Sequence, residues 1–266
     1  MDIHIGFIGC GNMATAMIDG IIRSGLIPAD HIIASRRSKA ALSEIKKKYG
    51  IQVTADNGEV AEKSDIIVLA VKPNMYVQIM RELAGRNQSG KIYISIAPGK
   101  TLAFLAEGLG HEAKIVRTMP NTPAMAGAGI TAACPNANVS SEEFEAVMTV
   151  LRTFGAAERI DESLFDAVVA VSGSSPAYVF MFIEAMADAA VKAGMPRKQA
   201  YTFAAQAVMG SAKLMLETGK HPAELKDMVC SPAGTTIEAV AQLEAHGFRS
   251  AVMEAMAACA AKSQQM

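Results

Sequence analysis

The fold of this 266-residue chain is decided by residues 3–14, which read Ile3-His4-Ile5-Gly6-Phe7-Ile8-Gly9-Cys10-Gly11-Asn12-Met13-Ala14. The apolar residues before Gly9 predict a buried strand, and the apolar spacing that follows the stretch predicts a helix. Between them lies a Gly-x-Gly-x-x-Ala turn: Gly9 permits a tight bend, Gly11 lets a ligand approach the backbone, and small Ala14 lets helix and strand pack closely. Free N–H groups at the helix start bind phosphate oxygens. The motif favours a dinucleotide site over a purely structural turn of the same spacing.

The residues after this turn alternate between short apolar strands and helices. Further strands are predicted at 32–34, 52–54, 65–71, 91–96, 113–117, 129–134 and 156–160, and helices at 39–49, 75–84, 102–109 and 141–153. The last of these helices starts at a capping box, in which Ser140 precedes Glu143 by three residues. Residues 65–71 are apolar throughout, as in a central parallel strand covered on both faces. We therefore expect an α/β Rossmann-type doubly wound sheet over residues 1–161.

The strand pattern ends after Asp161, and an all-α dimerisation domain is predicted over 162–266. Its helices are expected at 162–193, 196–218, 221–229, 234–246 and 248–263. The helix around 177–190 is apolar on nearly every side, so it must be covered on nearly every side. The remaining helices of so small a domain cannot easily do this. We expect a second copy of the chain to help, the alternative being that the helix packs on the first domain alone.

Composition excludes several classes of protein. A net charge of −1 and the absence of Trp argue against a nucleic-acid-binding surface. The longest uninterrupted apolar run, 177–183, is too short to cross a bilayer, and no targeting signal is visible, so a soluble cytoplasmic protein without a membrane partner is expected. Four scattered cysteines are typical of a reducing compartment, and no zinc-ligand spacing occurs among the five histidines, so no metal is expected.

Cofactor choice is predicted from the end of the second strand, Ser35-Arg36-Arg37. NAD-binding folds usually carry a carboxylate there for the ribose 2′-hydroxyl, whereas a hydroxyl and guanidinium groups suit a 2′-phosphate. NADPH is therefore favoured, although a solvated basic turn would look the same. Lys72-Pro73 and Asn121 also follow predicted strands, where such folds bind ligands. Lys72 would meet a phosphate or solvent, and Asn121 would face the nicotinamide or make an ordinary turn.

The helical half contains a second candidate site, Ser231-Pro232-Ala233-Gly234-Thr235-Thr236. This loop leads into the helix predicted from 234, and it offers free N–H groups and hydroxyls to a small carboxylate. The alternative is a helix start that binds no ligand.

Together these motifs resemble the pyrroline-5-carboxylate reductase family over essentially the whole chain. The most specific match is Leu225-Lys226-Asp227-Met228-Val229-Cys230-Ser231-Pro232-Ala233-Gly234-Thr235-Thr236-Ile237-Glu238-Ala239. Residues 7–13, 71–73, 119–123 and 172–178 also match segments of that family, and Gly247-Phe248-Arg249 follows at the family spacing. Ser175 and Ala233 stand where glycine is more usual, which puts the shape of the substrate loop slightly in doubt.

The resemblance implies reduction of Δ1-pyrroline-5-carboxylate to L-proline, with NADPH as the cofactor and NADH possible. It also implies a helical domain that interleaves with its partner's in a homodimer or a larger ring of dimers. By carry-over, Thr236 is the catalytic residue that reaches the ring nitrogen, and no side chain in the matched loops is an obvious proton donor. The substrate carboxylate would be held by Ser231, Ala233, Gly234 and Thr235. The cofactor would be bound by Gly9, Cys10, Gly11, Asn12, Met13, Ser35, Arg36, Asn57, Ala70, Lys72, Pro73, Ala97 and Asn121.

Two other functions stay open. One is an NADP-dependent reductase of another cyclic imine or of a β-hydroxyacid; the β-hydroxyacid enzymes generally use a lysine on the long helix, and none occurs between Ser174 and Lys192. The other is a non-catalytic cofactor-binding sensor, which would not need the second anion site at 231–236.

Overall fold

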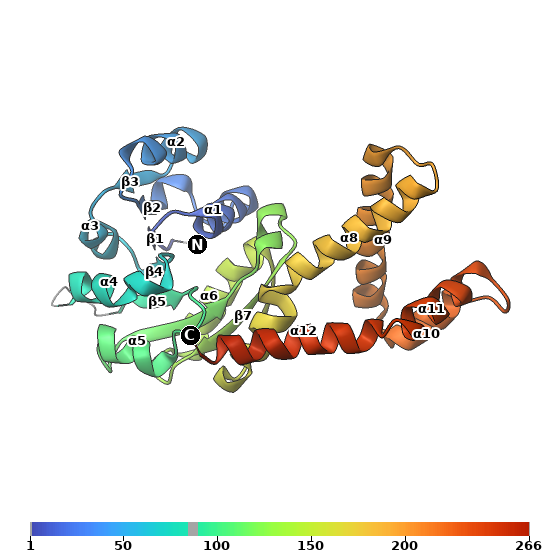
Figure 1. Ribbon diagram of the computed structural model, residues 1–266. Helices are drawn as coiled ribbons and strands as arrows, with labels where there is room; N and C mark the ends of the chain where they lie inside the picture. The colour runs from blue at the N-terminus through green and yellow to red at the C-terminus, as the bar shows by residue number, and fades with distance from the viewer. Residues whose placement is uncertain (1, 85–89, 266) are drawn as a thin grey trace. The chain divides into compact units, whose positions relative to one another are not determined.

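The computed structural model describes residues 2–84 and 90–265 and divides into two compact units (Figure 1). Residues 1–174 together with 259–266 form the first unit, and residues 175–258 form the second. The last strand ends at Arg159, next to the domain boundary predicted at 161, whereas the first unit continues to Ser174. That domain boundary stays a prediction.

The first unit is built on one eight-stranded sheet of described residues, in the order β3-β2-β1-β4-β5-β6-β7-β8. The strands are β1 (Ile5–Ile8), β2 (Ile32–Ser35), β3 (Gln52–Thr54), β4 (Ile66–Leu69), β5 (Ile92–Ser95), β6 (Lys114–Met119), β7 (Gly129–Pro135) and β8 (Gly155–Arg159). Only the β6–β7 pair is antiparallel among these neighbours. Strand order reverses between β1 and β4, which is where doubly wound sheets open a crevice for ligands. The predicted Rossmann-type sheet is confirmed, strand by strand.

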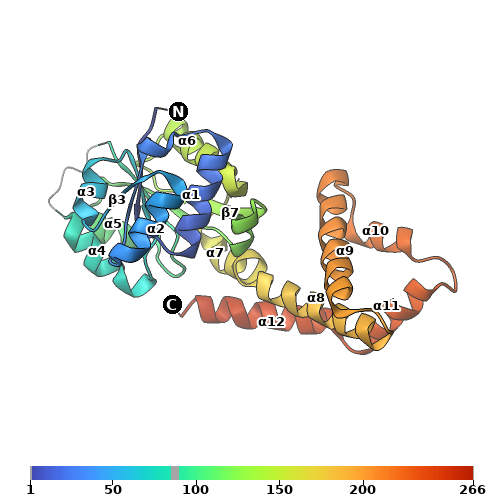
Figure 2. The same cartoon turned by 90° about the horizontal axis from the view of Figure 1, so that it is seen from above.

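Helices cover both faces of this sheet (Figure 2). One face packs against α1 (Asn12–Ser24), α2 (Lys39–Tyr49) and α6 (Ser141–Leu151), and the other against α3 (Asn57–Glu62), α4 (Tyr76–Leu83) and α5 (Leu102–Leu109). The central strands β1 and β4 are buried at every position, as expected for strands with apolar neighbours on both sides. The short helix α3 is not among the helices predicted from the sequence.

The segment that follows the sheet differs from the single helix predicted over 162–193. It consists of a 3₁₀ turn (Glu162–Leu164), α7 (Phe165–Val168) and a π-helical turn (Val169–Gly173), after which α8 (Ser175–Lys192) begins the second unit. In the π turn the Ser174 N–H donates to the Val169 carbonyl, five residues back, at 2.8 Å. The prediction missed this wider turn, because the apolar spacing of an α-helix continues through it.

The second unit contains α8, α9 (Arg197–Thr218), α10 (Pro222–Val229), α11 (Thr235–Ala245) and most of α12 (Phe248–Ser263). These helices lie close to the predicted ranges. Helices α8 and α9 pack against each other, and the side chains buried in the unit are alanines, Ala187, Ala200 and Ala204, which allow close approach. Large apolar side chains of the unit remain exposed, among them Phe180, Met181 and Phe203.

Candidate functional site

The glycine-rich turn joins β1 to α1 and depends on Gly9. Gly9 has φ +89°, and a Cβ atom at this position would lie 2.7 Å from the Ala70 carbonyl oxygen at the end of β4. A side chain would therefore meet both an unfavourable backbone conformation and the neighbouring strand end. Gly11 is different, because a Cβ atom there would have no neighbour within 4 Å. The open space beside Gly11 is where a ligand can approach the backbone.

The start of α1 is free to bind an anion. No side chain caps it, and its first turn contains no acidic residue. The first helical hydrogen bond runs from the Thr15 N–H to the Gly11 carbonyl at 2.9 Å, so the N–H groups of residues 12–14 have no partner within the helix. These N–H groups and the helix dipole favour phosphate oxygens.

Cys10 lies within this turn and is buried. Burial raises the pKa of the Cys10 thiol, an effect that the hydrogen bond with Thr15 opposes. The thiol is therefore neutral at neutral pH, and it adds no negative charge beside the phosphate-binding turn.

A cleft of about 510 Å³ opens at this edge of the sheet, between the ends of β1, β2 and β4. Burial raises the pKa of Tyr76 to about 12, and its hydroxyl donates to the Leu69 carbonyl at 2.6 Å, which fixes α4 to the end of β4. The cleft is lined by Gly9, Cys10, Gly11, Ser35, Arg36, Arg37, Ser38, Ala55, Asp56, Asn57, Ala70, Val71, Lys72, Met75, Gln78, Ile79 and Glu82.

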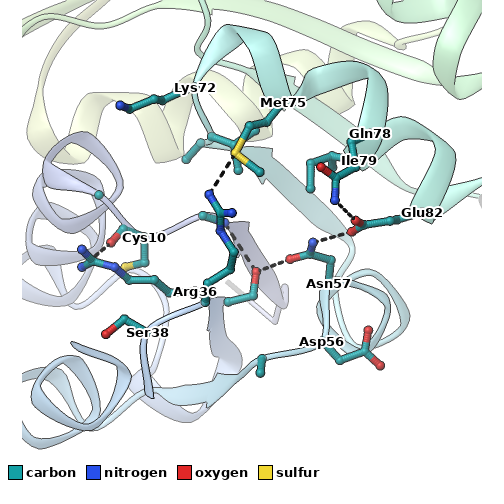
Figure 3. Close-up of a pocket in the computed structure, with 17 residues that line it drawn as sticks. Cys10, Arg36, Ser38, Asp56, Asn57, Lys72, Met75, Gln78, Ile79 and Glu82 are labelled. Carbon is teal, nitrogen blue, oxygen red and sulfur yellow. Dashed lines mark hydrogen bonds between the residues drawn. The ribbon is translucent and has the colours of Figure 1, made fainter. Parts of the chain in front are cut away.

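The end of β2 supplies the basic side of the cleft (Figure 3). Arg36 Nη1 donates to the Cys10 carbonyl at 3.1 Å, so its guanidinium lies against the glycine-rich turn. Arg37 Nη2 reaches the Met75 sulfur at 3.5 Å from the other side. The Ser35 hydroxyl is buried and accepts from the Gly9 N–H at 3.4 Å. The guanidinium groups of Arg36 and Arg37 and the Ser35 hydroxyl thus line the part of the cleft where the sequence predicts that a 2′-phosphate binds.

A chain of hydrogen bonds continues from Ser35 across the cleft (Figure 3). The Ser35 hydroxyl donates to Asn57 Oδ1 at 2.6 Å, and Asn57 Nδ2 donates to Glu82 Oε2 at 2.7 Å. Gln78 Nε2 donates to Glu82 Oε1, also at 2.7 Å. The network connects β2, α3 and α4 and places a carboxylate in the cleft.

The cleft contains most but not all of the residues predicted to bind the cofactor. Gly9, Cys10, Gly11, Ser35, Arg36, Asn57, Ala70 and Lys72 line it, whereas Asn12, Met13, Pro73, Ala97 and Asn121 do not. Sequence reasoning did not name Met75, Gln78, Ile79 and Glu82, which reach the cleft from α4 and the turn before it. Nothing in the local sequence marks them, because their position depends on how α4 packs against the sheet.

The Asn121 side chain makes hydrogen bonds to two separate segments of the chain. Its Nδ2 donates to the Ser172 carbonyl in the π turn at 3.1 Å, and its Oδ1 accepts from the Ile130 N–H at 2.9 Å. The residue is 8% exposed. In this structure Asn121 therefore joins the loop after β6, the start of β7 and the π turn.

The second candidate site is the loop before α11, in the second unit. The Gly234 N–H donates to the Ser231 carbonyl at 3.0 Å, and Ala233 has φ +57°, the left-handed conformation that favours glycine. Glycine is more usual at position 233 in the family that the chain resembles, and this backbone angle is the physical reason.

The Gly234 N–H is thus occupied within the turn and is not free for a carboxylate. The N–H groups of Thr235 and Thr236, in the first turn of α11, have no partner within the helix. Gly234 is the N-cap residue of α11, and because glycine has no side chain, no side chain caps this helix. The N–H groups of Thr235 and Thr236 are thus available to an anion at the start of α11.

The residues present fit a dinucleotide with a 2′-phosphate. The cleft combines an uncapped helix start, open space beside Gly11 and two guanidinium groups. A pyrophosphate needs the first two features, and a 2′-phosphate is stabilised by the third.

Comparison with known proteins gives the same picture in both halves of the chain. Residues 162–266 match a family model described as pyrroline-5-carboxylate reductase dimerisation, and residues 4–99 match one described as NADP oxidoreductase coenzyme F420-dependent. The pyrroline-5-carboxylate reductase of Escherichia coli K12 is 53% identical over 266 residues, which cover 100% of this chain and 99% of that protein.

Two solved structures are similar over nearly the full length. A pyrroline-5-carboxylate reductase from Coxiella burnetii has a TM-score of 0.91 at 32% identity and covers 100% of this chain and 98% of its own. A pyrroline carboxylate reductase from Plasmodium falciparum, solved with NADP bound, has a TM-score of 0.90 at 34% identity, with coverage of 99% and 98%.

Proposed function

The chain belongs to the pyrroline-5-carboxylate reductase family, and we propose that it reduces Δ1-pyrroline-5-carboxylate to L-proline, the last step of proline biosynthesis. The observation that carries this proposal is the cleft at the β1–β4 crevice, where an uncapped helix start and two guanidinium groups suit NADPH. The chain's family consists of NADP-dependent oxidoreductases. When NADPH is bound, it supplies the hydride.

The residues of the first unit hold and orient the cofactor. The N–H groups at Asn12 and Met13 face the pyrophosphate position, and Ser35, Arg36 and Asn57 surround the 2′-phosphate position. Ala97 and Pro73 lie at or beyond the ends of β5 and β4, on the same edge of the parallel sheet, and shape its surroundings.

The loop before α11 binds the substrate. The N–H groups of Ala233, Thr235 and Thr236, with the Ser231 hydroxyl, hold the substrate carboxylate, and the Thr236 hydroxyl bonds the ring nitrogen. A protonated ring nitrogen makes the neighbouring carbon more electrophilic, so the iminium is the reactive form. The protein contributes orientation and a shaped site, and the ring nitrogen takes its proton from solvent or arrives protonated.

The chain works as a homodimer or a larger ring of dimers in the cytoplasm, without nucleic acid or membrane partners. Helical residues 162–192 are long and apolar enough to cross a membrane by length and composition alone, and 11% of the most apolar stretch is buried in one chain. A core helix of a soluble protein passes the same test. Because residues 162–266 match a dimerisation model, we assign the cover over these apolar side chains to a second copy of the chain.

The test is the loss of NADPH absorbance when Δ1-pyrroline-5-carboxylate is added to the purified protein. Rapid loss with formation of proline supports the proposal. No loss, although NADPH binds, would contradict it and would favour a reductase of another imine or β-hydroxyacid, or a sensor. A panel of cyclic imines and β-hydroxyacids in the same assay separates these alternatives.

A further inference from the structure

We infer that Glu82, a residue of α4, sets the balance between NADPH and NADH; the inference rests on the proposed function, because it concerns the same cofactor cleft. Glu82 lines the cleft together with Ser35, Arg36 and Arg37, and it is connected to Ser35 through Asn57 (Figure 3). A single residue, Asn57, therefore links the Glu82 carboxylate to Ser35, and the 2′-substituent of the adenosine ribose is expected beside Ser35.

The Glu82 carboxylate is held in a defined position. Its Oε2 accepts from Asn57 Nδ2 and its Oε1 accepts from Gln78 Nε2, each at 2.7 Å. Asn57 in turn accepts from the Ser35 hydroxyl at 2.6 Å, so both ends of its amide are engaged. An Asn57 amide that bonds to Glu82 cannot give the same N–H to a phosphate. Glu82 therefore competes with a 2′-phosphate for Asn57 in addition to repelling its charge.

A carboxylate near the ribose 2′-hydroxyl is a common feature of doubly wound nucleotide-binding folds. Doubly wound NAD-binding folds place a carboxylate at the end of the second strand, where it accepts from the ribose 2′-hydroxyl. Here that strand ends in Ser35, and the carboxylate comes from α4 instead. The other carboxylate in the lining, Asp56, caps α3 through the Gly58 N–H at 2.8 Å and points away from the Asn57–Glu82 pair (Figure 3).

Opposing charges therefore meet in one cleft. Arg36 and Arg37 favour the dianionic 2′-phosphate of NADPH, and Glu82 disfavours it while tolerating the 2′-hydroxyl of NADH. Removing the charge of Glu82 should strengthen NADPH binding and should leave NADH binding unchanged or weaker. For a carboxylate that lines the same cleft as the phosphate and is partly screened by solvent, we expect a change of about 3- to 10-fold in the ratio of the two affinities.

The experiment compares Glu82→Gln with the wild type. A glutamine at this position keeps the size of the side chain and an oxygen that accepts from Asn57, while its NH2 group replaces the oxygen that accepts from Gln78, whose amide can turn over to accept instead. The substitution therefore removes the charge and retains the bond to Asn57. Glu82→Asp keeps the charge on a shorter side chain. Glu44→Gln is the matched control, because Glu44 is exposed on α2, does not line the cleft and loses the same charge.

The first readout needs no turnover. Dissociation constants of adenosine 2′,5′-bisphosphate and AMP are measured by calorimetry at low and high salt, with the melting temperature of each variant as a check of folding. We expect Glu82→Gln to raise the preference for the bisphosphate over AMP about 3- to 10-fold at low salt and less at high salt. Glu44→Gln should leave the preference unchanged, and Glu82→Asp should stay closer to the wild type than Glu82→Gln.

The second readout is kinetic. With Δ1-pyrroline-5-carboxylate, Glu82→Gln should raise the NADPH-to-NADH ratio of kcat/KM through KM, with kcat unchanged. An unchanged preference, a lower one, or an equal loss for both nucleotides would overturn the inference. Failure of the wild type to turn over would overturn the proposed function instead, and the calorimetric preference would still decide the role of Glu82.

Discussion

Gly9 and Gly11 belong to the same phosphate-binding turn, and substitution can separate their roles. Gly9→Ala places a methyl group at φ +89° and 2.7 Å from the Ala70 carbonyl oxygen, so we expect the free energy of unfolding to fall by about 1–3 kcal/mol. Gly11 has φ −94° and open space, so Gly11→Ala should leave stability within about 0.5 kcal/mol and weaken NADPH binding. Chemical denaturation and nucleotide titration of both variants check this pair. Equal stability losses would contradict the assignment.

Arg36 should discriminate between the two cofactors. Arg36→Asp removes a guanidinium from the 2′-phosphate position and adds a repelling charge, so affinity for NADPH should fall at least about 10-fold more than affinity for NADH. A small common loss is also expected, because Arg36 bonds to the Cys10 carbonyl in the glycine-rich turn. Titration with both nucleotides measures this difference, and equal losses would refute the 2′-phosphate role.

Thr236 is the residue whose hydroxyl we place on the substrate nitrogen. If it makes that one hydrogen bond, Thr236→Ala should lose about 1.5–3 kcal/mol of transition-state stabilisation, or about 10- to 150-fold in kcat/KM. Thr236→Ser keeps the hydroxyl and should retain most of the activity. A near-wild-type alanine variant would remove Thr236 from the mechanism, whether or not the chain reduces the imine.

At the level of single elements, the start of α6 gives a prediction with a defined pH dependence. The Ser140 hydroxyl accepts from the Glu143 N–H at 3.2 Å, and Glu143 Oε2 accepts from the Ser140 N–H at 3.0 Å, while Oε1 pairs with Lys114 on β6. The ion pair with Lys114, followed by the bond from the Ser140 N–H, lowers the pKa of Glu143 below its ordinary value. The capping box therefore also ties α6 to the sheet.

The sign of the effect follows from this lowered pKa. The stabilisation by Glu143 is fully present above its unfolded-state pKa and is lost as the pH falls through the lower folded-state value. Glu143→Gln should thus be less stable than the wild type by about 1 kcal/mol at neutral pH, and the difference should shrink at acidic pH. Unfolding free energies across this range provide the measurement. Glu145→Gln, whose exposed carboxylate pairs with Arg152, is the control and should change stability less.

Elements differ in how well the sequence predicts them, for physical reasons. The strands and long helices follow from local apolar periodicity, and the Ser140 capping box is confirmed because its hydrogen bonds span three residues. The π turn at 169–173 escapes prediction because the apolar spacing of an α-helix continues through it, and the bond from Asn121 to the Ser172 carbonyl joins residues far apart in the sequence. The same division applies to the candidate site. Ser35 and Arg36 follow a strand and could be predicted, whereas Glu82 reaches the cleft through the packing of α4.

For the whole molecule, the two units differ in how well they bury their large apolar side chains, and this difference bears on assembly. The first unit buries its apolar side chains on both faces of the sheet. The second leaves large ones exposed in a single chain: Phe180 on α8 is 64% exposed, Met181 68% and Phe203 on α9 66%. Large apolar side chains left exposed in such number are typical of an interface between subunits. We therefore expect this unit to acquire its core only when a second copy of the chain covers these side chains.

Association can be tested by placing a charge on that surface. Phe203→Glu would bury an unpaired carboxylate in the proposed interface, so the variant should dissociate toward single chains, and its second unit should lose protection from proteolysis. Lys198→Glu adds the same side chain at an exposed charged position on the same helix and should leave the assembly intact. Light scattering after size exclusion measures the mass of each. A wild-type mass of one chain, or a Phe203→Glu variant with unchanged mass, would show that the apolar surface has another purpose. A mass of two chains or more for the wild type, lost in Phe203→Glu alone, would mean that the fold of the helical unit is completed by its partner.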